Sequence, residues 1–330
     1  MQTERMVVLK ESAKTMSTTK TVADTTKPAI DLVTGKSSCS LWLENLPLYR
    51  GQKVAFLGNY KAEPNACAYA VEMLHEAAAI AEKESGARYL IGPINGNTWN
   101  PYRLVTEGFD LPAFALETYT DKAYPGQFEA AGFVSVAEYA SSILPCKEDF
   151  CGTGESLAKE LADKGIRVRN FDRSKVKEEL DALYKVSTEA FADNFLYSPI
   201  TKEQFLSLYK PIIDIVDEEL VLIAEKDGIA VGYLFAIANK LLAPTNNVFN
   251  DSLVLKTLAR VPGTKEELGG IGLYLTSLCH ARAKAKGFER MIHALYKNDN
   301  RSACFSNSPD IEVFRKYNLF AKELNHGTSN

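Results

Sequence analysis

Residues 262–272 read PGTKEELGGIG, and this stretch decides how the last third of the chain is interpreted. It separates a strand-like run, SLVLKTLARV, from a helix-like run, IGLYLTSLCHARAKAKG. The free N–H groups and the positive end of a helix lie together at such a junction. Gly270 and Gly272 lack a Cβ, so a phosphate group can approach their backbone closely. The stretch therefore predicts a diphosphate site, although glycines that only turn the chain explain it equally well.

The elements around this stretch predict a mixed α/β domain. Upstream, IRVRNFD is typical of a strand, and KVKEELDALYKVSTEAF and ITKEQFLSLYKPII are typical of helices. ELVLIAE and IAVGYLFAIA flank Asp227 and Gly228, and an Asp-Gly pair between apolar runs is a strong hairpin signal. Downstream, ERMIHALYK and EVFRKYNLFAKEL predict two further strands.

The first half also predicts an α/β arrangement. SLWLENLPLY and QKVAFLGNY are typical of strands, ACAYAVEMLHEAAAIAEKE of a helix that ends at Gly86, and ARYLIGPIN of a following strand. A strand, a helix and a strand in this order predict a parallel crossover. PAFALETYT, a short helix near Pro125 and the strand GFVSVAEYASSIL follow. SLAKELADKG predicts a linker helix, and we expect the boundary between two domains there.

Composition excludes several classes of function. A chain of 330 residues with 46% hydrophobic residues is long enough for two cores. The net charge of -4, with cations interspersed among acids, argues against nucleic acid as a partner. No run approaches the ~20 apolar residues of a membrane span. The six cysteines have no metal-binding spacing, so we expect no metal. The leader lacks a secretory apolar core and is poor in arginine, which favours a cytoplasmic protein. We expect either a monomer or a homodimer.

The order of elements in the second half resembles that of the GNAT superfamily of N-acyltransferases. The resemblance is carried by the hairpin, the strand, ELGGIG, the helix, KGF, a strand followed by KNDNRSA, and a last strand. The coenzyme A motif of this family is Gln or Arg, two residues, Gly, one residue, and Gly or Ala. Gly270 and Gly272 match this motif, whereas Glu267 does not. A carboxylate at ~4 Å from a diphosphate costs about 4 kcal/mol at an effective dielectric of about 20, so we expect Glu267 to point away.

The first half resembles the first half of bacterial proteins with two fused GNAT-like domains, through LIGPINGNTWNPYRLVTEGF and FEAAGF. It has NYKAEPNACAY where the second half has ELGGIG, and so resembles a domain without the coenzyme motif. Two tandem domains are implied, each a mixed, mostly antiparallel sheet flanked by helices. The implied segments are a flexible polar tail (1–38), an N-terminal GNAT-like domain (39–148), a linker helix (149–165) and a catalytic C-terminal GNAT domain that binds acyl-CoA (166–330).

The resemblance also implies a donor site. Backbone N–H groups of the strand before the loop stabilise the oxyanion of the tetrahedral intermediate, and those of the loop bind the diphosphate. The implied residues are Leu258, Ala259, Arg260, Val261, Leu268, Gly269, Gly270, Ile271, Gly272, Leu273 and Asn300. Many family members protonate the leaving thiolate with a tyrosine that follows Asn, two residues, Ala, two residues and Leu. Asn300 fits this pattern, but the tyrosine position is Asn307, so Tyr296 and Tyr317 are the nearest alternatives.

Several polar residues are candidates for the acceptor site. Asn95, Asn97 and Trp99 follow the C-terminal end of a strand, which is a common ligand position in α/β sheets. Asparagines that form turns and a tryptophan that fills the domain interface explain these residues at least as well. The family resemblance adds Tyr197 and Tyr233. Further candidates for the pocket are Arg103, Glu107 and Tyr119, and for phosphate contacts Lys256, Lys265 and Arg301.

Our leading hypothesis is an enzyme that transfers an acyl group from acetyl-CoA or another acyl-CoA, as co-substrate, to the amine of a small molecule by direct attack. An alkyl ammonium with a pKa near ~10.4 must first lose a proton, so a base or a water relay is required. His293 alternates with apolar residues in its strand, which favours a core histidine over that base. A catalytically silent binding protein of the same fold is the alternative. A nucleotide-dependent oxidoreductase is disfavoured, because neither LGNYKAE nor GPINGN gives a GxGxxG turn.

Overall fold

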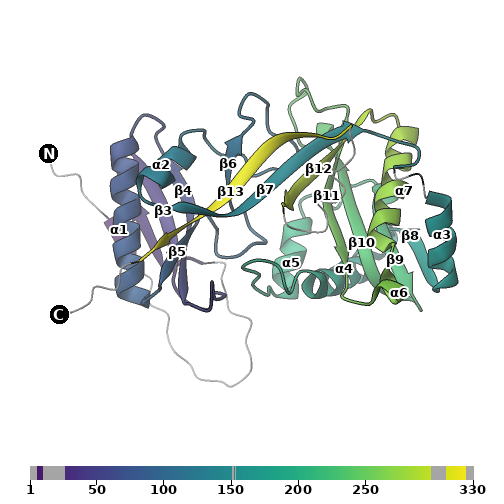
Figure 1. Ribbon diagram of the computed structural model, residues 1–330, viewed down its shortest axis with the longest axis horizontal. Coiled ribbons are helices and arrows are strands. Elements are labelled where there is room, and N and C mark those ends of the chain that lie inside the picture. Colours follow the sequence, from purple (N-terminus) through teal and green to yellow (C-terminus); the bar gives the residue numbers. More distant parts are fainter. Residues whose placement is uncertain (1–5, 10–26, 151, 153, 299–309, 325–330) are drawn as a thin grey trace, which may run out of the picture.

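The protein consists of two lobes that share one mixed sheet of 13 strands (Figure 1). This computed structural model describes residues 6–9, 27–150, 152, 154–298 and 310–324. The strand order is β1-β2-β3-β4-β5-β13-β7-β12-β11-β10-β9-β8, and β6 pairs with β13 beside this path. Most neighbours are antiparallel, and β4 with β5 and β11 with β12 are parallel. The predicted mixed, mostly antiparallel α/β fold is confirmed, in one continuous sheet.

The N-terminal lobe packs one long helix on a sheet of short strands. α1 buries Ala70, Met73, Leu74 and Ala77, which share one helix face. It ends at Gly86, whose φ of 63° is the left-handed conformation typical of a helix end. The elements of this lobe are β1 (Met6–Leu9), β2 (Ile30–Val33), β3 (Ser37–Trp42), β4 (Val54–Ala62), α1 (Cys67–Ser85), β5 (Tyr89–Gly92), β6 (Leu104–Glu107) and α2 (Tyr124–Ala130).

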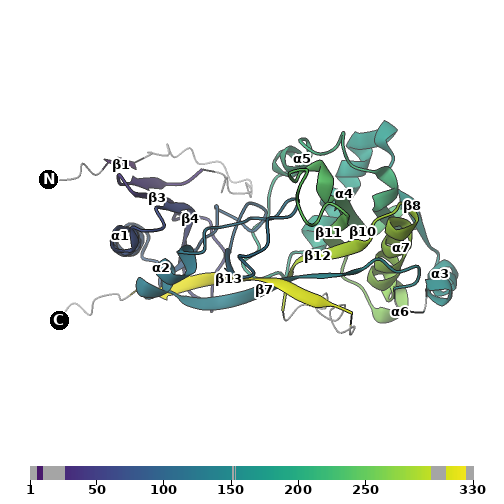
Figure 2. The same ribbon diagram turned by 90° about the horizontal axis from the view of Figure 1, so that it is seen from above.

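The C-terminal lobe has helices on both faces of its sheet (Figure 2). In β10, Tyr233 and Phe235 pack with the apolar side chains of α4 and α5, whereas Leu234 and Ala236 pack with those of α7 and α3. The elements are α3 (Gly154–Asp163), β8 (Ile166–Asn170), η1 (Arg173–Lys175), α4 (Val176–Ala190), α5 (Lys202–Tyr209), η2 (Glu218–Leu220), β9 (Val221–Lys226), β10 (Ile229–Ala238), η3 (Asn239–Leu241), β11 (Ser252–Arg260), α6 (Lys265–Leu268), α7 (Ile271–Ala285) and β12 (Arg290–Lys297).

The predicted hairpin between β9 and β10 is confirmed. The strands pair antiparallel, and Asp227 and Gly228 lie in the turn with φ values of 52° and 76°. Two successive positive φ angles are what a type I′ turn requires, and Asp-Gly adopts them at low cost.

Two long strands join the lobes. β7 (Val134–Pro145) and β13 (Glu312–Glu323) pair antiparallel with each other and run across both lobes (Figure 1). β13 also pairs with β5 and β6, and β7 also pairs with β12. The sequence assigns the last strand to the domain 166–330, and this is wrong, since its partners lie in the N-terminal lobe and in β7. An alternating pattern identifies a strand but not its partner, which tertiary packing decides.

The N-terminal segment needs a second correction. Residues 1–38 are expected as a flexible tail, but β1 pairs with β2, β2 pairs with β3, and Ile30 and Leu32 are buried in the core under α1. The alternation in β2 covers only four residues next to a polar run, so composition hides it.

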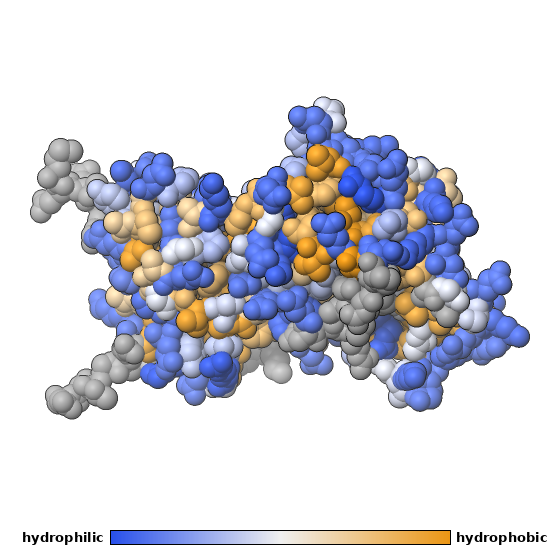
Figure 3. Space-filling model, turned by 45° about the horizontal axis from the view of Figure 1, so that its top comes forward, coloured by the Kyte–Doolittle hydropathy of each residue, from blue (hydrophilic) through white to orange (hydrophobic). Residues whose placement is uncertain are grey.

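Apolar side chains are exposed on the surface of the C-terminal lobe. Figure 3 shows the largest connected orange area of that view on the right-hand lobe. Leu241, Leu242 and Val248, in the connection between β10 and β11, are among the exposed apolar residues of this lobe. Of the helices that the structure describes, none is long and apolar enough to cross a membrane.

Candidate functional site

The sheet opens between β11 and β12. The two strands pair in parallel only as far as Leu255 and His293 and then separate. A bulge at Lys256 interrupts the pairing of β11 with β10, and an irregularity follows His293 in β12, where Leu295 has a φ of 60°. Bulges bend strands and end their pairing. The two strands therefore diverge and leave a gap, which we call the open split.

A cavity of about 880 Å³ occupies the open split. It reaches Thr276 of α7 and, elsewhere on its wall, Tyr209 at the end of α5. Trp99 of the N-terminal lobe forms a further wall. Because α7 and α5 cover opposite faces of the sheet, the cavity connects both faces. Two reactants can meet in the split from opposite sides.

The glycine-containing stretch lies at the N-terminus of α7. Gly270 precedes the helix with a φ of 91°, a conformation that is strained for any residue with a Cβ. The N–H of Tyr274 donates to the carbonyl of Gly270. The preceding N–H groups, those of Ile271, Gly272 and Leu273, have no partner among the described residues, as expected for a first helical turn. This helix start therefore offers three donors to an anion.

Glu267 is engaged in a cap of the short helix α6. Thr264 Oγ1 accepts the N–H of Glu267 at 3.1 Å, and Oε2 of Glu267 accepts from Thr264 Oγ1 at 3.2 Å. The carboxylate is thus held at the start of α6. This position agrees with the expectation that Glu267 points away from a diphosphate at the start of α7.

One turn of α7 connects the glycine-containing stretch to the cavity. Thr276 Oγ1 donates to the carbonyl of Gly272 at 2.9 Å, and Thr276 lines the cavity. Four helical residues span about 6 Å, so one extended ligand can reach from the helix start into the split. On the other side, Leu157 of α3 lies 3.2 Å from the position that a Cβ on Gly270 would take. The helix expected as a linker therefore forms a wall of this site.

The strand before the loop presents Leu258 to the split. The N–H of Val261 donates to the carbonyl of Val231 on the β10 side. Successive N–H groups of a strand point to opposite edges, so those of Leu258 and Arg260 face the split. Leu258 lines the cavity, whereas Ala259, Arg260 and Val261 do not.

Two predicted loop residues have other roles. Leu268 is buried in the core beneath α7, and the carbonyl of Gly269 accepts a hydrogen bond from Lys164 at 3.3 Å. Neither lines the cavity among the residues described. Gly270, Ile271, Gly272 and Leu273 do not line it either, but the free N–H groups of the helix start lie one turn from Thr276, which does. Of the predicted donor residues that the structure describes, Leu258 therefore lies on the cavity wall and the helix start lies beside it.

Of the predicted catalytic residues, Tyr296 lines the cavity and Tyr317 does not. Tyr317 is fully buried in β13, where its hydroxyl donates to Glu117 and lies 3.1 Å from that of Ser141. Burial, and then the Glu117 carboxylate, raise the pKa of Tyr317. Tyr317 therefore belongs to a core network, and Tyr296 is the candidate acid that we retain. Asn300 lies outside the described residues.

Two of the predicted acceptor residues line the cavity. Trp99 and Tyr197 lie on its wall, and Nε1 of Trp99 donates to the carbonyl of Ser198 at 3.0 Å. Tyr233 does not reach the cavity, because its ring is fully buried and its hydroxyl lies 2.8 Å from that of Ser187. The phenol in β10 thus supports the core.

Asn97 forms a turn, which is the alternative to ligand binding that its sequence context offers. It is buried, and its Oδ1 accepts the N–H groups of Trp99 at 2.9 Å and Asn100 at 3.2 Å. These bonds orient the segment that carries Trp99. Asn97 therefore acts on the cavity only through its neighbour.

A lysine that we considered for phosphate contacts lies on the cavity wall instead. Lys256, at the bulge of β11, donates to the carbonyl of Leu116 at 2.7 Å. Burial, and then the charge of Arg103, lower the pKa of Lys256 to about 7, while Glu117 acts in the opposite direction. Glu117 itself is paired with Arg315 at 3.1 Å. Lys256 is therefore partly neutral near pH 7 and can exchange protons with the cavity.

Two histidines meet between β12 and α7. His293 lines the cavity, and its Nε2 lies 3.1 Å from Nε2 of His280 on α7. Burial lowers the pKa of His293 to about 4, and burial together with the charge of His293 lowers that of His280 to about 2. Phe150 stacks on His280 with ring centroids 4.3 Å apart. The pair is neutral at pH 7, which agrees with the expectation of a hydrogen-bonded core histidine.

A solved structure has the same arrangement of sheet and helices. It is a GCN5-related glucosamine N-acetyltransferase region of a fungal multi-domain GH3 β-N-acetylglucosaminidase, with a TM-score of 0.53 and 13% sequence identity. The similarity covers 89% of this chain and 32% of that one. The chain has a GNAT fold.

Two curated proteins are similar to this GNAT-fold chain in sequence. A bacterial ceramide synthase of Caulobacter vibrioides is 26% identical over 159 residues, which are 47% of this chain and 40% of that protein. The protein YghO of Escherichia coli is 24% identical over 160 residues, 48% of this chain and 40% of that protein. The match thus spans about two-fifths of the length of each curated relative. No protein-family model matches the chain.

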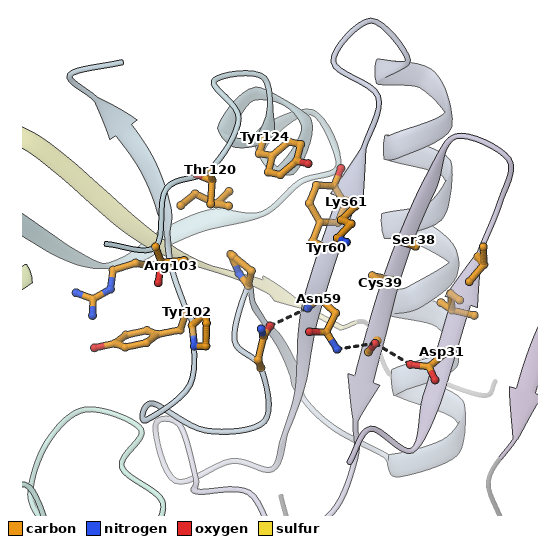
Figure 4. Close-up of a pocket in the computed structure, with 18 residues that line it drawn as sticks. Asp31, Ser38, Cys39, Asn59, Tyr60, Lys61, Tyr102, Arg103, Thr120 and Tyr124 are labelled. Carbon is orange, nitrogen blue, oxygen red and sulfur yellow. Dashed lines mark hydrogen bonds between the residues drawn. The ribbon is translucent and has the colours of Figure 1, made fainter. Parts of the chain in front are cut away.

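The N-terminal lobe of this GNAT-fold chain has a second split, between β4 and β5. The two strands pair in parallel over three residue pairs, and the pairing of β4 with β3 is irregular near Asn59. Asn95 Oδ1 accepts the N–H of Asn59 at 2.7 Å (Figure 4). A Cβ on Gly58 would lie 2.4 Å from the carbonyl oxygen of Ile94. The chain fills this gap itself, so we call it the closed split.

A cavity of about 610 Å³ lies beside the closed split. Asn95, expected near the acceptor, lines this cavity and not the open split. Arg103 borders both cavities. Figure 4 shows its guanidinium next to Tyr102 and pointing away from the wall formed by Asn59 and Asp31. Its charged end therefore faces the region between the lobes.

Proposed function

We propose that the protein is a GNAT-type N-acyltransferase that transfers an acyl group from acyl-CoA to an amine in the open split. The observation that carries this proposal is the cavity between β11 and β12, which reaches both faces of the sheet beside an unpaired helix start. The GNAT fold supports acyl transfer in general. Coenzyme A as the carrier, the amine acceptor and the steps below are part of the proposal.

The proposed donor binds along α7 and β11. The diphosphate lies at the N–H groups of Ile271, Gly272 and Leu273, where the positive helix end favours an anion. The pantetheine chain extends past Thr276 into the split. The thioester carbonyl then accepts the N–H of Leu258, which stabilises the negative charge of the tetrahedral intermediate.

The chemistry requires three proton transfers. The acceptor ammonium first loses a proton, and Lys256 accepts it in our proposal, because its lowered pKa leaves part of it neutral near pH 7. The amine nitrogen then attacks the thioester carbon, the C–S bond breaks, and the nitrogen releases its second proton to solvent, which gives an amide and a thiolate. Tyr296, on the same cavity wall, protonates the thiolate. A thiol with a pKa near ~8.5 also leaves with help from water, so Tyr296 contributes less than Lys256.

The acceptor that fits this cavity has a large apolar part. Phe191, Phe195 and Tyr197 lie on one stretch of the wall, and Leu208 and Ile212 on another. Aromatic and aliphatic walls of this kind bind hydrocarbon or aromatic groups. The similarity to a protein named bacterial ceramide synthase supports this class of acceptor, since a ceramide is the amide formed when a long-chain amine is acylated on nitrogen.

Donor binding and turnover test the proposal in sequence. Calorimetry with acetyl-CoA, octanoyl-CoA and palmitoyl-CoA measures the dissociation constant of each donor. Mass spectrometry then detects amides after incubation with a panel of long-chain and short amines. We expect binding of at least one donor, release of free thiol, and more product from long-chain amines. Absence of binding to all donors would falsify the proposal, and binding without any amide would indicate a silent binding protein.

A further inference from the structure

Arg103 is a buried cation beside the open split. Its residue is 7% exposed, and the structure describes no carboxylate in an ion pair with its guanidinium. Within the described chain, Nη1 donates one hydrogen bond, to the carbonyl of Leu295 at 3.2 Å. A buried charge without a counter-charge is costly, and a ligand that supplies the counter-charge offsets this cost.

The surroundings of Arg103 leave the edge of its guanidinium available. Cζ lies 3.9 Å from the ring centroid of Tyr102 and 4.2 Å from that of Tyr139. These rings stabilise the cation through its faces, so they do not use its remaining N–H donors. An Arg edge with parallel N–H groups binds a carboxylate or a phosphate in a bidentate manner.

The neighbouring charges do not neutralise Arg103. Lys256 is a second basic group of the same cavity, and Glu117 is committed to the ion pair with Arg315 and to Tyr317. Asp193 and Lys297 also line the cavity, so the other charges of its wall nearly balance, and Arg103 keeps its own charge without an ion pair among the residues described. An anion that enters the cavity meets both basic groups.

We propose that Arg103 binds an anionic group of the acceptor, so that the acceptor is an apolar amine with a carboxylate or a phosphate a few bonds from its nitrogen. This inference rests on the proposed function, because it concerns the second substrate of the same split. Nη1 already contacts Leu295 at the irregularity of β12, so an anion on Arg103 lies next to the reacting centre. An α-amino acid with a long apolar side chain has this arrangement of groups.

Matched pairs of acceptors test the inference. 2-Aminodecanoate and nonylamine differ by one carboxylate, and sphinganine 1-phosphate and sphinganine differ by one phosphate. The rate constant kcat/KM for each acceptor is measured with the wild-type protein and with Arg103→Gln. Charged hydrogen bonds predict that the wild type prefers the anionic member of at least one pair by about 10-fold to 100-fold. In Arg103→Gln, we expect this preference to fall to about 1.

Arg50→Gln is the matched control. Arg50 is also an arginine with a positive φ, 51° against 72° for Arg103, and its Cζ also lies over a tyrosine ring, at 5.1 Å from that of Tyr49. It lies outside the cavity of the split. Arg50→Gln should keep the preference of the wild type. The variant Arg103→Lys, which keeps the charge but not the planar fork, should keep part of it.

Binding without a donor separates this inference from the proposed function. Calorimetry measures the affinity of 2-aminodecanoate and of nonylamine in the absence of any acyl-CoA, and thermal unfolding confirms that each variant is folded. If anion-dependent binding is lost in Arg103→Gln, the inference holds even where no acyl transfer is detected. Equal binding of the paired compounds by the wild type, or an unchanged preference in Arg103→Gln, overturns it. A loss of acyl-CoA affinity alone in Arg103→Gln assigns the arginine to the donor and also overturns it.

Discussion

The two splits of the sheet arise from the same strand geometry but differ in what fills them. In both, a parallel strand pair separates near an irregularity in the first strand, β4 in one lobe and β11 in the other. In the closed split, Asn59 near the irregularity donates its N–H to Asn95 of the same lobe. In the open split, none of the residues that the structure describes takes the corresponding place, and a cavity of about 880 Å³ remains.

The helices that follow the two splits, α1 and α7, also begin differently. α7 begins after Gly270, which has a positive φ, and offers three N–H groups without a partner in the described chain. α1 begins after Ala66, and the N–H of Ala70 is the first to pair, with the carbonyl of Ala66. Its first turn, CAYA, thus also leaves N–H groups without a backbone partner among the described residues, but it contains no glycine. In our proposal, the split supplies the space for the ligand, and the sequence at the helix start supplies the contact with its phosphates.

The largest expected effect is on donor affinity at the start of α7. Gly272→Glu places a carboxylate beside the proposed diphosphate, and a repulsion of up to about 4 kcal/mol is expected at ~4 Å. We expect the dissociation constant of acyl-CoA, measured by calorimetry, to rise at least ~100-fold. Cys67→Glu makes the matched change at the exposed first residue of α1 and should leave the affinity unchanged. Equal effects of both variants would mean that the two helix starts do not differ in function.

The next effect concerns the stability of the folded protein at acidic pH, to which two histidines beside the open split contribute. In the unfolded chain, His280 and His293 take up protons below pH ~6.5, whereas in the folded protein they stay neutral until about pH 2 and 4. Their stabilising contribution is therefore complete above pH 6.5 and decreases as the pH falls toward 4. We expect a loss of about 3 kcal/mol in the free energy of unfolding between pH 7 and pH 5, measured by urea denaturation.

Variants identify the source of this loss. Between pH 7 and pH 5, the free energy of unfolding of the double variant His280→Leu with His293→Leu should fall by at least ~2 kcal/mol less than that of the wild type. His75→Gln, on the exposed side of α1, should behave like the wild type. A wild-type slope in the double variant would assign the acid sensitivity to other groups.

A smaller effect distinguishes the packing of the two splits. Gly58→Ala forces a Cβ against Ile94 and Asn95 in the closed split, and we expect a destabilisation of about 2 kcal/mol. Gly272→Ala places its Cβ 3.6 Å from Leu258, which is an ordinary contact, and should leave stability unchanged or raise it by up to about 1 kcal/mol. Chemical denaturation of both variants measures the difference. Equal stability of the two variants would contradict a filled split in the N-terminal lobe.

The smallest effect is expected at Glu267. Its carboxylate caps α6 through Thr264. Glu267→Gln therefore keeps the cap and removes only a charge that lies away from the proposed diphosphate. We expect the dissociation constant of acyl-CoA to change less than about threefold and the stability by less than about 0.5 kcal/mol. A tenfold gain in affinity would show that the carboxylate repels the donor after all.

The local elements of the C-terminal lobe follow from the sequence. Asp227 with Gly228 predicts the hairpin, and the glycines of ELGGIG predict the start of α7, because turn geometry and helix starts depend on neighbouring residues. Trp99 and Tyr197 were among the predicted residues and do line the cavity. The turn and the helix start need little knowledge of long-range packing, whereas the place of Trp99 on a cavity of the other lobe depends on it.

The roles of Tyr317, Arg103 and Lys256 do not follow from the sequence in the same way. Tyr317 lies beside Glu117, which is 200 positions earlier in the chain. The lowered pKa of Lys256 depends on burial and on Arg103, which belongs to the other lobe. Likewise, Asn95 looks like a ligand residue in the sequence, and only the structure shows it bonded to Asn59. Each of these features depends on contacts that a linear pattern does not contain.

The position of β13 has a consequence for how the protein forms. It follows every other described strand in the chain, yet it lies between β5 and β7 in the middle of the sheet. Until this strand is synthesised, β5 and β7 each expose an edge with unpaired backbone groups, which is a template for aggregation. The two lobes should therefore denature together in one transition, and neither should be obtained in folded form by cutting the chain between them.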